Sequence, residues 1–192
     1  MYKRQLVEEY RQSLLIRKLD QYFIDRQIDT VFTDEEVAAY YRDHIGDFKL
    51  DRTIVRGRIL QFDQGYRQAS KLLALMGSKS PARQKDFADI CLKNNFVLAD
   101  FTGTWVEFGE FLSYLPTLRS QNYDQLLKPG EIQQMRDSRS HYYFEITDVL
   151  RAGEPSPQER VRETIRRILF NQRQGEIIRS HEEELYLSLI HI

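Results

Sequence analysis

The segment Thr53–Phe62, TIVRGRILQF, constrains the fold of this sequence most. Its side chains alternate as in an extended strand, which places Arg56 and Arg58 on the same face as Leu60 and Phe62. Residues 52–62 are therefore the predicted opening strand of a sheet. The pattern also raises the question of why a half-buried strand carries guanidinium groups beside core side chains.

A second alternating segment, HYYFEITDVL, predicts the closing strand. Tyr142, Phe144 and Ile146 share one of its faces. LLKPGEIQQM before it has Pro-Gly turn chemistry followed by a short strand, and RDSRS predicts a hairpin between the two strands. The stretch VLADFTGTWVEFGEF predicts short strands and turns, and FLSYLP predicts a single helical turn.

Helical spacing of apolar residues predicts helices on either side of these strands. Leu6–Arg26 is predicted to be one long amphipathic helix, and TDEE from Thr33 predicts a capping box that opens a second helix. A helix that closes at Gly77 and another that starts at Ser80 and Pro81 are expected between the strands. The last helix is expected to bend or break near Gly175.

Composition excludes several classes of protein. Lys and Arg total 28 against 29 acidic residues, which gives no electrostatic reason to expect a nucleic acid or an anionic membrane as the main partner. The apolar runs are too short to span a bilayer. The single cysteine, Cys91, is interpreted as a small buried hydrophobe. No cofactor motif is visible, and the four histidines have no metal-ligand spacing: His44, His141, His181 and His191.

The phrases FTDEEVAAYYRDHIGDFKL, IVRGRIL and LLKPGEI…HYYFEITDV resemble the parvulin family of peptidyl-prolyl isomerases. More particularly, they resemble the SurA- and PrsA-type foldases, in which helices flank a parvulin domain. The resemblance implies an α+β fold with a small antiparallel sheet and helices, similar to the FKBP-like fold. It divides the chain into an N-terminal helical module at 6–49, a parvulin-like domain at 50–152 and a C-terminal helix at 156–187 that packs back on the first helices.

The sequence departs from active parvulins where the family carries histidines. Arg58 stands at the first of these positions, and Tyr142 or Tyr143 at the second. The family's Gly-Gly pair is reduced to Gly103-Thr104. An arginine is always protonated and offers only donors, so it cannot replace a neutral imidazole that both donates and accepts. We therefore assign no catalytic residue and expect a domain that has lost isomerase activity.

The former catalytic cavity is expected to be a groove for extended, aromatic-rich polypeptide. The residues predicted to line it are Arg56, Arg58, Leu60, Trp105, Phe108, Phe111, Tyr114, Tyr142 and Phe144. In the alternative interpretation, each arginine pairs with a carboxylate such as Asp100 or Glu107 and simply closes the cavity.

By resemblance, the chain is expected to be a SurA-like chaperone of the periplasm or cell envelope that binds unfolded outer-membrane or secreted clients. One alternative is an active isomerase with an unusual site around Tyr142, Tyr143 and Cys91. Another is an assembly subunit for one dedicated protein partner. No cofactor and no metal are expected. The ends MYKRQ and LSLIHI resemble translated sequencing-adapter read-through and are expected not to belong to the natural protein.

Overall fold

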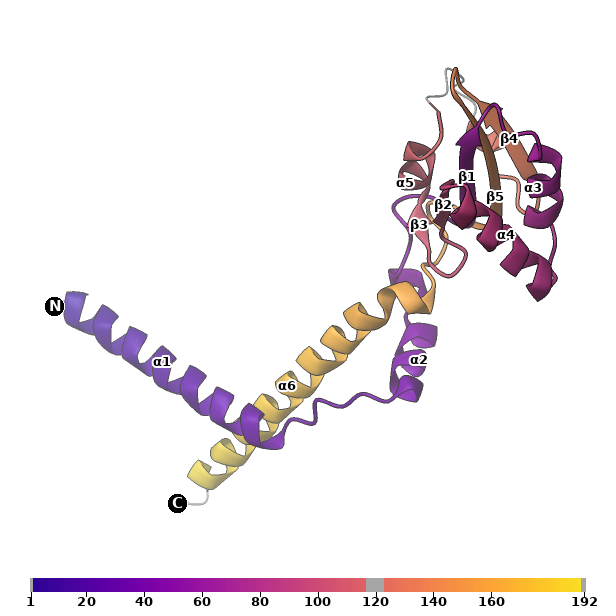
Figure 1. Ribbon diagram of the computed structural model, residues 1–192. Coiled ribbons are helices and arrows are strands. Elements are labelled where there is room, and N and C mark those ends of the chain that lie inside the picture. The colour runs from indigo at the N-terminus through magenta and orange to yellow at the C-terminus, as the bar shows by residue number, and fades with distance from the viewer. Residues whose placement is uncertain (1, 117–122, 191–192) are drawn as a thin grey trace. The chain divides into compact units, whose positions relative to one another are not determined.

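The structure is a computed structural model that describes residues 2–116 and 123–190 (Figure 1). It has an α+β fold and divides into two compact units. The sheet unit is Phe48–Ser156, and the helical unit is formed by the described residues up to Asp47 and from Pro157 onward. The assignment of these segments to a parvulin-like domain and its flanking helical modules stays a prediction.

The helical unit contains α1 (Tyr2–Gln27), α2 (Asp34–Asp43), a 3-10 turn (Ile45–Asp47) and α6 (Gln158–Ile190). The predicted capping box at Thr33 is confirmed: its hydroxyl accepts a bond from the Glu36 N–H at 3.2 Å, and the Glu36 carboxylate accepts one from the Thr33 N–H at 2.8 Å. The predicted break near Gly175 is absent, since α6 continues through it. A glycine costs a helix interior only about 1 kcal/mol.

The sheet unit is built around β1 (Ile54–Asp63) and β5 (Ser140–Leu150), the opening and closing strands. The antiparallel strand order is β2 (Val97–Asp100), β1, β5, β4 (Ile132–Arg136), and β3 (Val106–Glu107) also pairs with β1. The predicted hairpin is confirmed between β4 and β5. Asp137 closes it by accepting bonds from the N–H groups of Arg139 and Ser140 at 2.8 and 2.7 Å.

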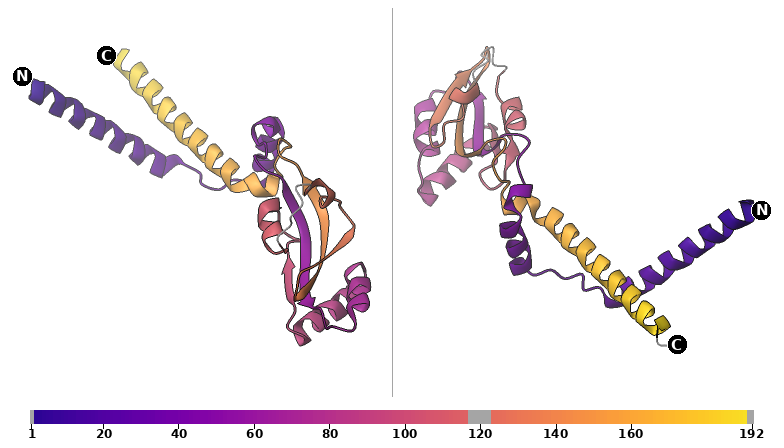
Figure 2. Two further views of the ribbon diagram at one scale, coloured as in Figure 1. Left: turned by 90° about the horizontal axis from the view of Figure 1, so that it is seen from above. Right: turned by 180° about the vertical axis from the view of Figure 1, so that it is seen from behind.

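Helices cover the sheet on both faces (Figures 1 and 2). α3 (Ala69–Met76) and α4 (Pro81–Lys93) pack on Leu60, Phe62 and Tyr143, and this core is named the α3/α4 face. α5 (Phe108–Ser113) packs on the opposite side against Ile59 and Phe144, and this core is named the α5 face. The expected start of α4 is confirmed, with Ser80 at the N-cap and Pro81 in the first turn.

β1 and β5 change register at Gly57, because Arg56 pairs with Asp148 whereas Gly57 pairs with Ile146. The strands approach so closely there that a Cβ on Gly57 would overlap the backbone carbonyl oxygen of Glu145. Gly57 also continues the ladder on its other side, since its carbonyl accepts a bond from the Phe101 N–H at 2.8 Å. Only glycine fits at this crossing of three backbone segments.

Candidate functional site

Arg58 lies on the α3/α4 face, where three elements contribute acceptors to its guanidinium. Its Nη2 donates to the Glu145 carboxylate at 3.0 Å and to the backbone carbonyl of Met76, and Nη1 donates to Gln84 at 2.7 Å. Its charged end also lies over the Phe87 ring, 5.7 Å from the centroid. The Arg58 and Glu145 side chains are only 14% and 17% exposed. The guanidinium therefore joins β1, β5 and the adjoining ends of α3 and α4.

The partners proposed for Arg58 in the alternative interpretation are wrong, although the kind of interaction is right. Glu107 pairs with Arg52 at 2.8 Å. Asp100 accepts bonds from the backbone N–H and hydroxyl of Thr102. The carboxylate that Arg58 contacts belongs to Glu145, which lies directly opposite it in the β1–β5 register. A strand-to-strand ion pair explains why an arginine shares a face with Leu60 and Phe62.

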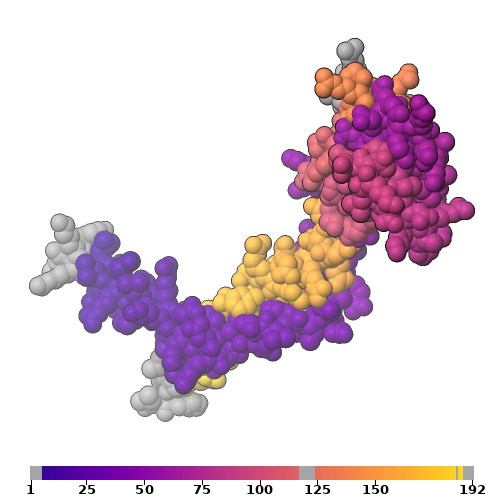
Figure 3. All heavy atoms as spheres, in the orientation of Figure 1, coloured from indigo at the N-terminus to yellow at the C-terminus, as the bar shows by residue number. Residues whose placement is uncertain are grey.

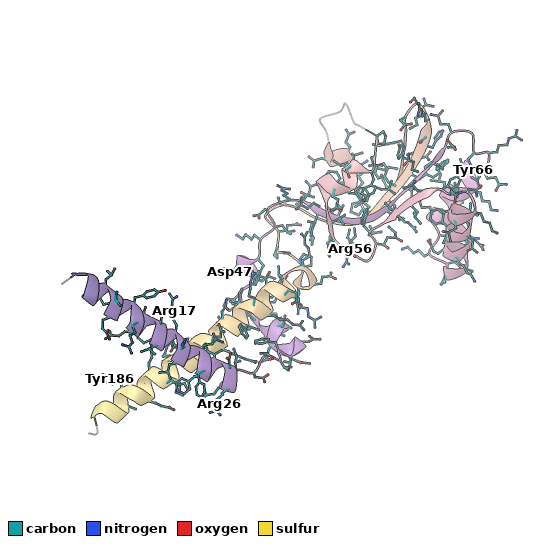
Figure 4. All side chains as sticks on the ribbon, turned by 60° about the vertical axis from the view of Figure 1, so that its left-hand side comes forward. Arg17, Arg26, Asp47, Arg56, Tyr66 and Tyr186 are labelled. Atoms are coloured by element: carbon teal, nitrogen blue, oxygen red, sulfur yellow. The ribbon has the colours of Figure 1, made fainter. Side chains whose placement is uncertain are left out.

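Arg56 lies near the other end of β1, where its guanidinium carbon is 4.7 Å from the centroid of the Trp105 ring. Figure 4 labels this arginine in the sheet unit. Both side chains are only partly buried. A guanidinium over an indole face is a favourable cation–π arrangement. The pair keeps a cation and a large aromatic ring at the surface of the sheet unit.

The predicted groove residues do not line one surface. Leu60 is fully buried on the α3/α4 face, whereas Phe111 and Phe144 are fully buried on the α5 face. Tyr142 is also buried on the α5 face, and Phe108 packs against that core. Tyr114 is 43% exposed and contacts the Phe101 ring edge-on. The binding role of these residues stays a prediction. Tyr114 is exposed, whereas Arg56, Arg58, Trp105 and Phe108 are partly buried.

The residues of the alternative isomerase site lie on both faces of the sheet. Tyr143 and Cys91 belong to the α3/α4 face, and Tyr142 belongs to the α5 face. Burial raises the pKa of both tyrosines, and for Tyr142 the hydrogen bond to Asp137 at 2.8 Å adds to the rise. Both phenols therefore stay protonated at neutral pH.

Cys91 is expected to react slowly with thiol reagents in the folded protein. Burial raises the pKa of its thiol to about 11, so the reactive thiolate is scarce at mildly alkaline pH. Alkylation by iodoacetamide, followed by mass spectrometry, should be roughly a hundredfold slower in the native chain than in urea. Equal rates in the two conditions would show that the thiol is accessible and that its predicted burial is wrong.

The described histidines lie beside aromatic rings. His44 stacks on Tyr40 at 4.0 Å between centroids, His141 on Phe62 at 5.6 Å and His181 on Phe23 at 3.5 Å. His191 is outside the described residues. Within the described ranges, no three His, Cys, Asp or Glu side chains are arranged to hold a metal ion. No helix in the same ranges is long and apolar enough to cross a membrane.

Helix α1 carries large apolar side chains that the described chain leaves exposed. They form the α1 apolar surface, with exposures from 40% to 67%: Leu6, Val7, Tyr10, Leu14, Leu15, Ile16, Leu19 and Tyr22. Leu14, Leu15 and Ile16 are consecutive and so point in different directions around the helix. A single neighbouring helix could not cover them all. In the view of Figure 3, the indigo N-terminal part of α1 extends beyond the yellow α6.

Among the described side chains, those at the C-terminal end of α1 are held against α6. Ile24 is buried, the Phe23 ring stacks on His181, and Gln27 Nε2 lies 3.1 Å from His181 Nε2. Arg173 then secures the connector to α2 by donating to the carbonyls of Asp29 and Val31 at 2.8 and 3.0 Å. These contacts fix the base of α1 and leave its apolar surface uncovered.

The last turns of α6 add a second accessible apolar region in the helical unit. Tyr186 and Leu187 are 67% and 56% exposed, and Figure 4 labels Tyr186 there. They line an open hollow of about 610 Å³ together with Arg179, Glu182 and Glu183. The helical pattern of the sequence predicted α1 but did not indicate that its apolar residues would be exposed, because periodicity does not say whether a neighbour covers them.

Comparisons with known proteins find a distant likeness to solved structures. No protein-family model matches the sequence, and a search of curated proteins finds no match. A solved structure of a SurA-like chaperone from Campylobacter jejuni, from work on the virulence factor PEB4 and the periplasmic protein Cj1289, is 13% identical. The match covers 96% of this chain and 71% of that chain, with a TM-score of 0.34.

Proposed function

We propose that this chain is a SurA-like chaperone of the cell envelope that holds unfolded polypeptide clients. The observation that carries the proposal is the α1 apolar surface, with Tyr10 and Val7 among its most exposed members at 67% and 65%. Contiguous exposed apolar side chains of this size are typical of surfaces that bind other proteins. Aromatic and branched aliphatic groups together suit the mixed side chains of an unfolded client.

The arrangement favours weak and reversible holding. Covering one large apolar side chain stabilises a complex by about 1.5–3 kcal/mol at most, and ordering a flexible client opposes this gain. Because the α1 apolar surface runs around a helix and does not form an enclosed pocket, each client segment covers only part of it. Such a client exchanges quickly and is released to fold.

The sheet unit is proposed to be parvulin-like and to contribute binding without catalysis. Arg58 occupies the position of a family histidine, and its guanidinium is already engaged by Glu145, Gln84 and Met76. Arg56, Trp105 and Tyr114 offer further contacts for client aromatic residues. A prolyl-peptide turnover assay should show no acceleration. Clear turnover that disappears in Tyr142→Phe would instead establish an isomerase.

The α1 apolar surface is testable by polar substitution. The triple variant Leu14→Gln, Leu15→Gln, Leu19→Gln keeps good helix formers and removes three exposed apolar groups. We expect that about fivefold more of this variant than of the parent chain is needed to halve the aggregation of an unfolded β-barrel protein, measured by light scattering.

The matched control removes exposed apolar groups from the sheet unit, with Leu92→Gln and Val97→Gln, which are 76% and 55% exposed in the parent chain. This control should suppress aggregation as the parent does. An equal loss of aggregation suppression in both variants would show that client binding does not depend specifically on α1. If the parent does not suppress aggregation but co-purifies with one stoichiometric protein, the chain is an assembly subunit and the chaperone proposal is wrong.

A further inference from the structure

The sheet unit has an open hollow of about 570 Å³ between the start of α3 and the end of α4, named here the basic hollow. Figure 4 labels Tyr66, one of its lining residues. The full lining is Gly65, Tyr66, Arg67, Gln68, Lys71, Ile90, Lys93 and Asn94. None of these residues belongs to the groove predicted from the sequence or to the α1 apolar surface.

Three cations line the basic hollow, and no carboxylate lines it. Arg67, Lys71 and Lys93 are exposed, and none forms an ion pair or a side-chain hydrogen bond with another described residue. The nearest acidic positions along the chain, Asp63 and Asp89, are not in the lining. Since the whole chain has a net charge of −1, the three uncompensated charges are a local feature.

The start of α3 adds further positive potential. Gln68 occupies the N-cap but makes no side-chain capping bond, and the first turn contains no acidic residue. The described residues provide no acceptor for the N–H groups of Ala69 and Ser70. In contrast, α2 begins with a complete capping box and Asp34, Glu35 and Glu36 in its first turn. An unsatisfied helix start next to three cations favours an anion.

Two large apolar side chains, Tyr66 and Ile90, form an apolar part of the mixed wall of the basic hollow. The Tyr66 ring packs edge-on against Phe96 at 4.9 Å and Phe62 at 6.2 Å between centroids. Ile90 is partly buried beside the same core. A small inorganic anion would use the cations but leave this wall uncovered. A chain that presents carboxylates beside apolar side chains would use both.

We propose that the basic hollow binds an acidic segment of an unfolded polypeptide whose carboxylates alternate with apolar side chains. The proposal rests on the proposed chaperone function and adds a client feature to it. Arg67, Lys71 and Lys93 contact the carboxylates, and Tyr66 and Ile90 contact the apolar side chains between them. The positive charge of the basic hollow selects acidic client segments, whereas the α1 apolar surface binds any apolar segment.

The test uses a fluorescein-labelled peptide of alternating Glu and Phe residues, with the full chain and fluorescence anisotropy at about 0.05 M salt. The triple variant Arg67→Gln, Lys71→Gln, Lys93→Gln is expected to bind this peptide about tenfold more weakly than the parent. The control variant, Arg83→Gln, Lys85→Gln, Arg136→Gln, removes the same charge from exposed positions of the sheet unit outside the hollow and should bind as the parent does. A peptide with Gln in place of Glu should not distinguish the three proteins.

Equal peptide affinity for parent and triple variant would overturn the proposal, as would equal losses in the triple and control variants. Aggregation assays on the same proteins distinguish failure of the acidic-segment proposal from failure of the chaperone proposal. If the chain is a chaperone, the parent suppresses client aggregation whatever the peptide result. A further measurement tests whether the same proteins bind vesicles with and without anionic phospholipid. Lysine- and arginine-dependent binding to anionic vesicles, without peptide binding, would assign the hollow to a lipid surface and refute the polypeptide proposal.

Discussion

Glu145→Ala is expected to lower the free energy of unfolding of the sheet unit by about 2–4 kcal/mol, because it leaves the largely buried Arg58 cation without its carboxylate. Gln84 and the Met76 carbonyl remain as neutral acceptors, which keeps the cost below that of a wholly unpaired charge. Urea unfolding followed by the fluorescence of Trp105, the single tryptophan, reports this unit.

Two comparisons make this prediction specific. Replacing the exposed carboxylate of the Arg52–Glu107 pair, whose side chains are 74% and 43% exposed, should change the same free energy by less than about 1 kcal/mol. The double variant Arg58→Met, Glu145→Leu should recover most of the loss, since apolar residues can replace a buried ion pair. A small loss in Glu145→Ala would show that Arg58 does not hold β1, β5 and the two helices together.

Gly57→Ala is expected to destabilise the sheet unit by about 3 kcal/mol or more. The new Cβ would overlap the Glu145 carbonyl oxygen and lie 3.1 Å from the Ile146 Cα, and neither backbone atom can move without separating β1 from β5. Because the same position pairs with Phe101, displacement would weaken the ladder on both sides of β1. The loss is measured by urea unfolding monitored through Trp105.

Gly103→Ala is the matched control for this substitution. A Cβ at Gly103 has no heavy atom within 4 Å, so the variant should unfold within about 0.5 kcal/mol of the parent. Both replacements lower the conformational entropy of the unfolded chain by a similar amount, so this effect cancels when the two variants are compared. If the two variants are equally stable, the strands do not cross as closely at Gly57 as the structure has them.

Local sequence signals predicted the elements that depend on near neighbours. The capping box joins Thr33 and Glu36, which are three residues apart in the first turn of α2. Pro81 favours the first turn of a helix by its own fixed backbone angle. The alternation of Tyr142, Phe144 and Ile146 also predicted their common face, which the α5 face contains. The predicted break at Gly175 is absent because the rest of the long helix outweighs one weak helix former.

The candidate site was harder to predict because it depends on partners distant in the sequence. Glu145 lies 87 residues from Arg58, and only the register of β1 and β5 makes them neighbours. Arg67, Lys71 and Lys93 belong to a turn and two helices, so no single motif contains them. Alternation correctly placed Arg58 beside Leu60, but it could not show that Glu145 would satisfy the arginine.

The first and last segments of the sheet unit are hydrogen-bonded to each other. The Ser156 N–H donates to the Phe48 carbonyl at 2.6 Å, and the Leu50 N–H donates to the Glu154 carbonyl at 2.9 Å. A segment whose entrance and exit are paired in this way can complete its own folding on the ribosome while the partner of α1 and α2 is still unsynthesised. The early helices α1 and α2 cannot make their contacts with α6 until the end of translation, so the helical unit is completed after the sheet unit.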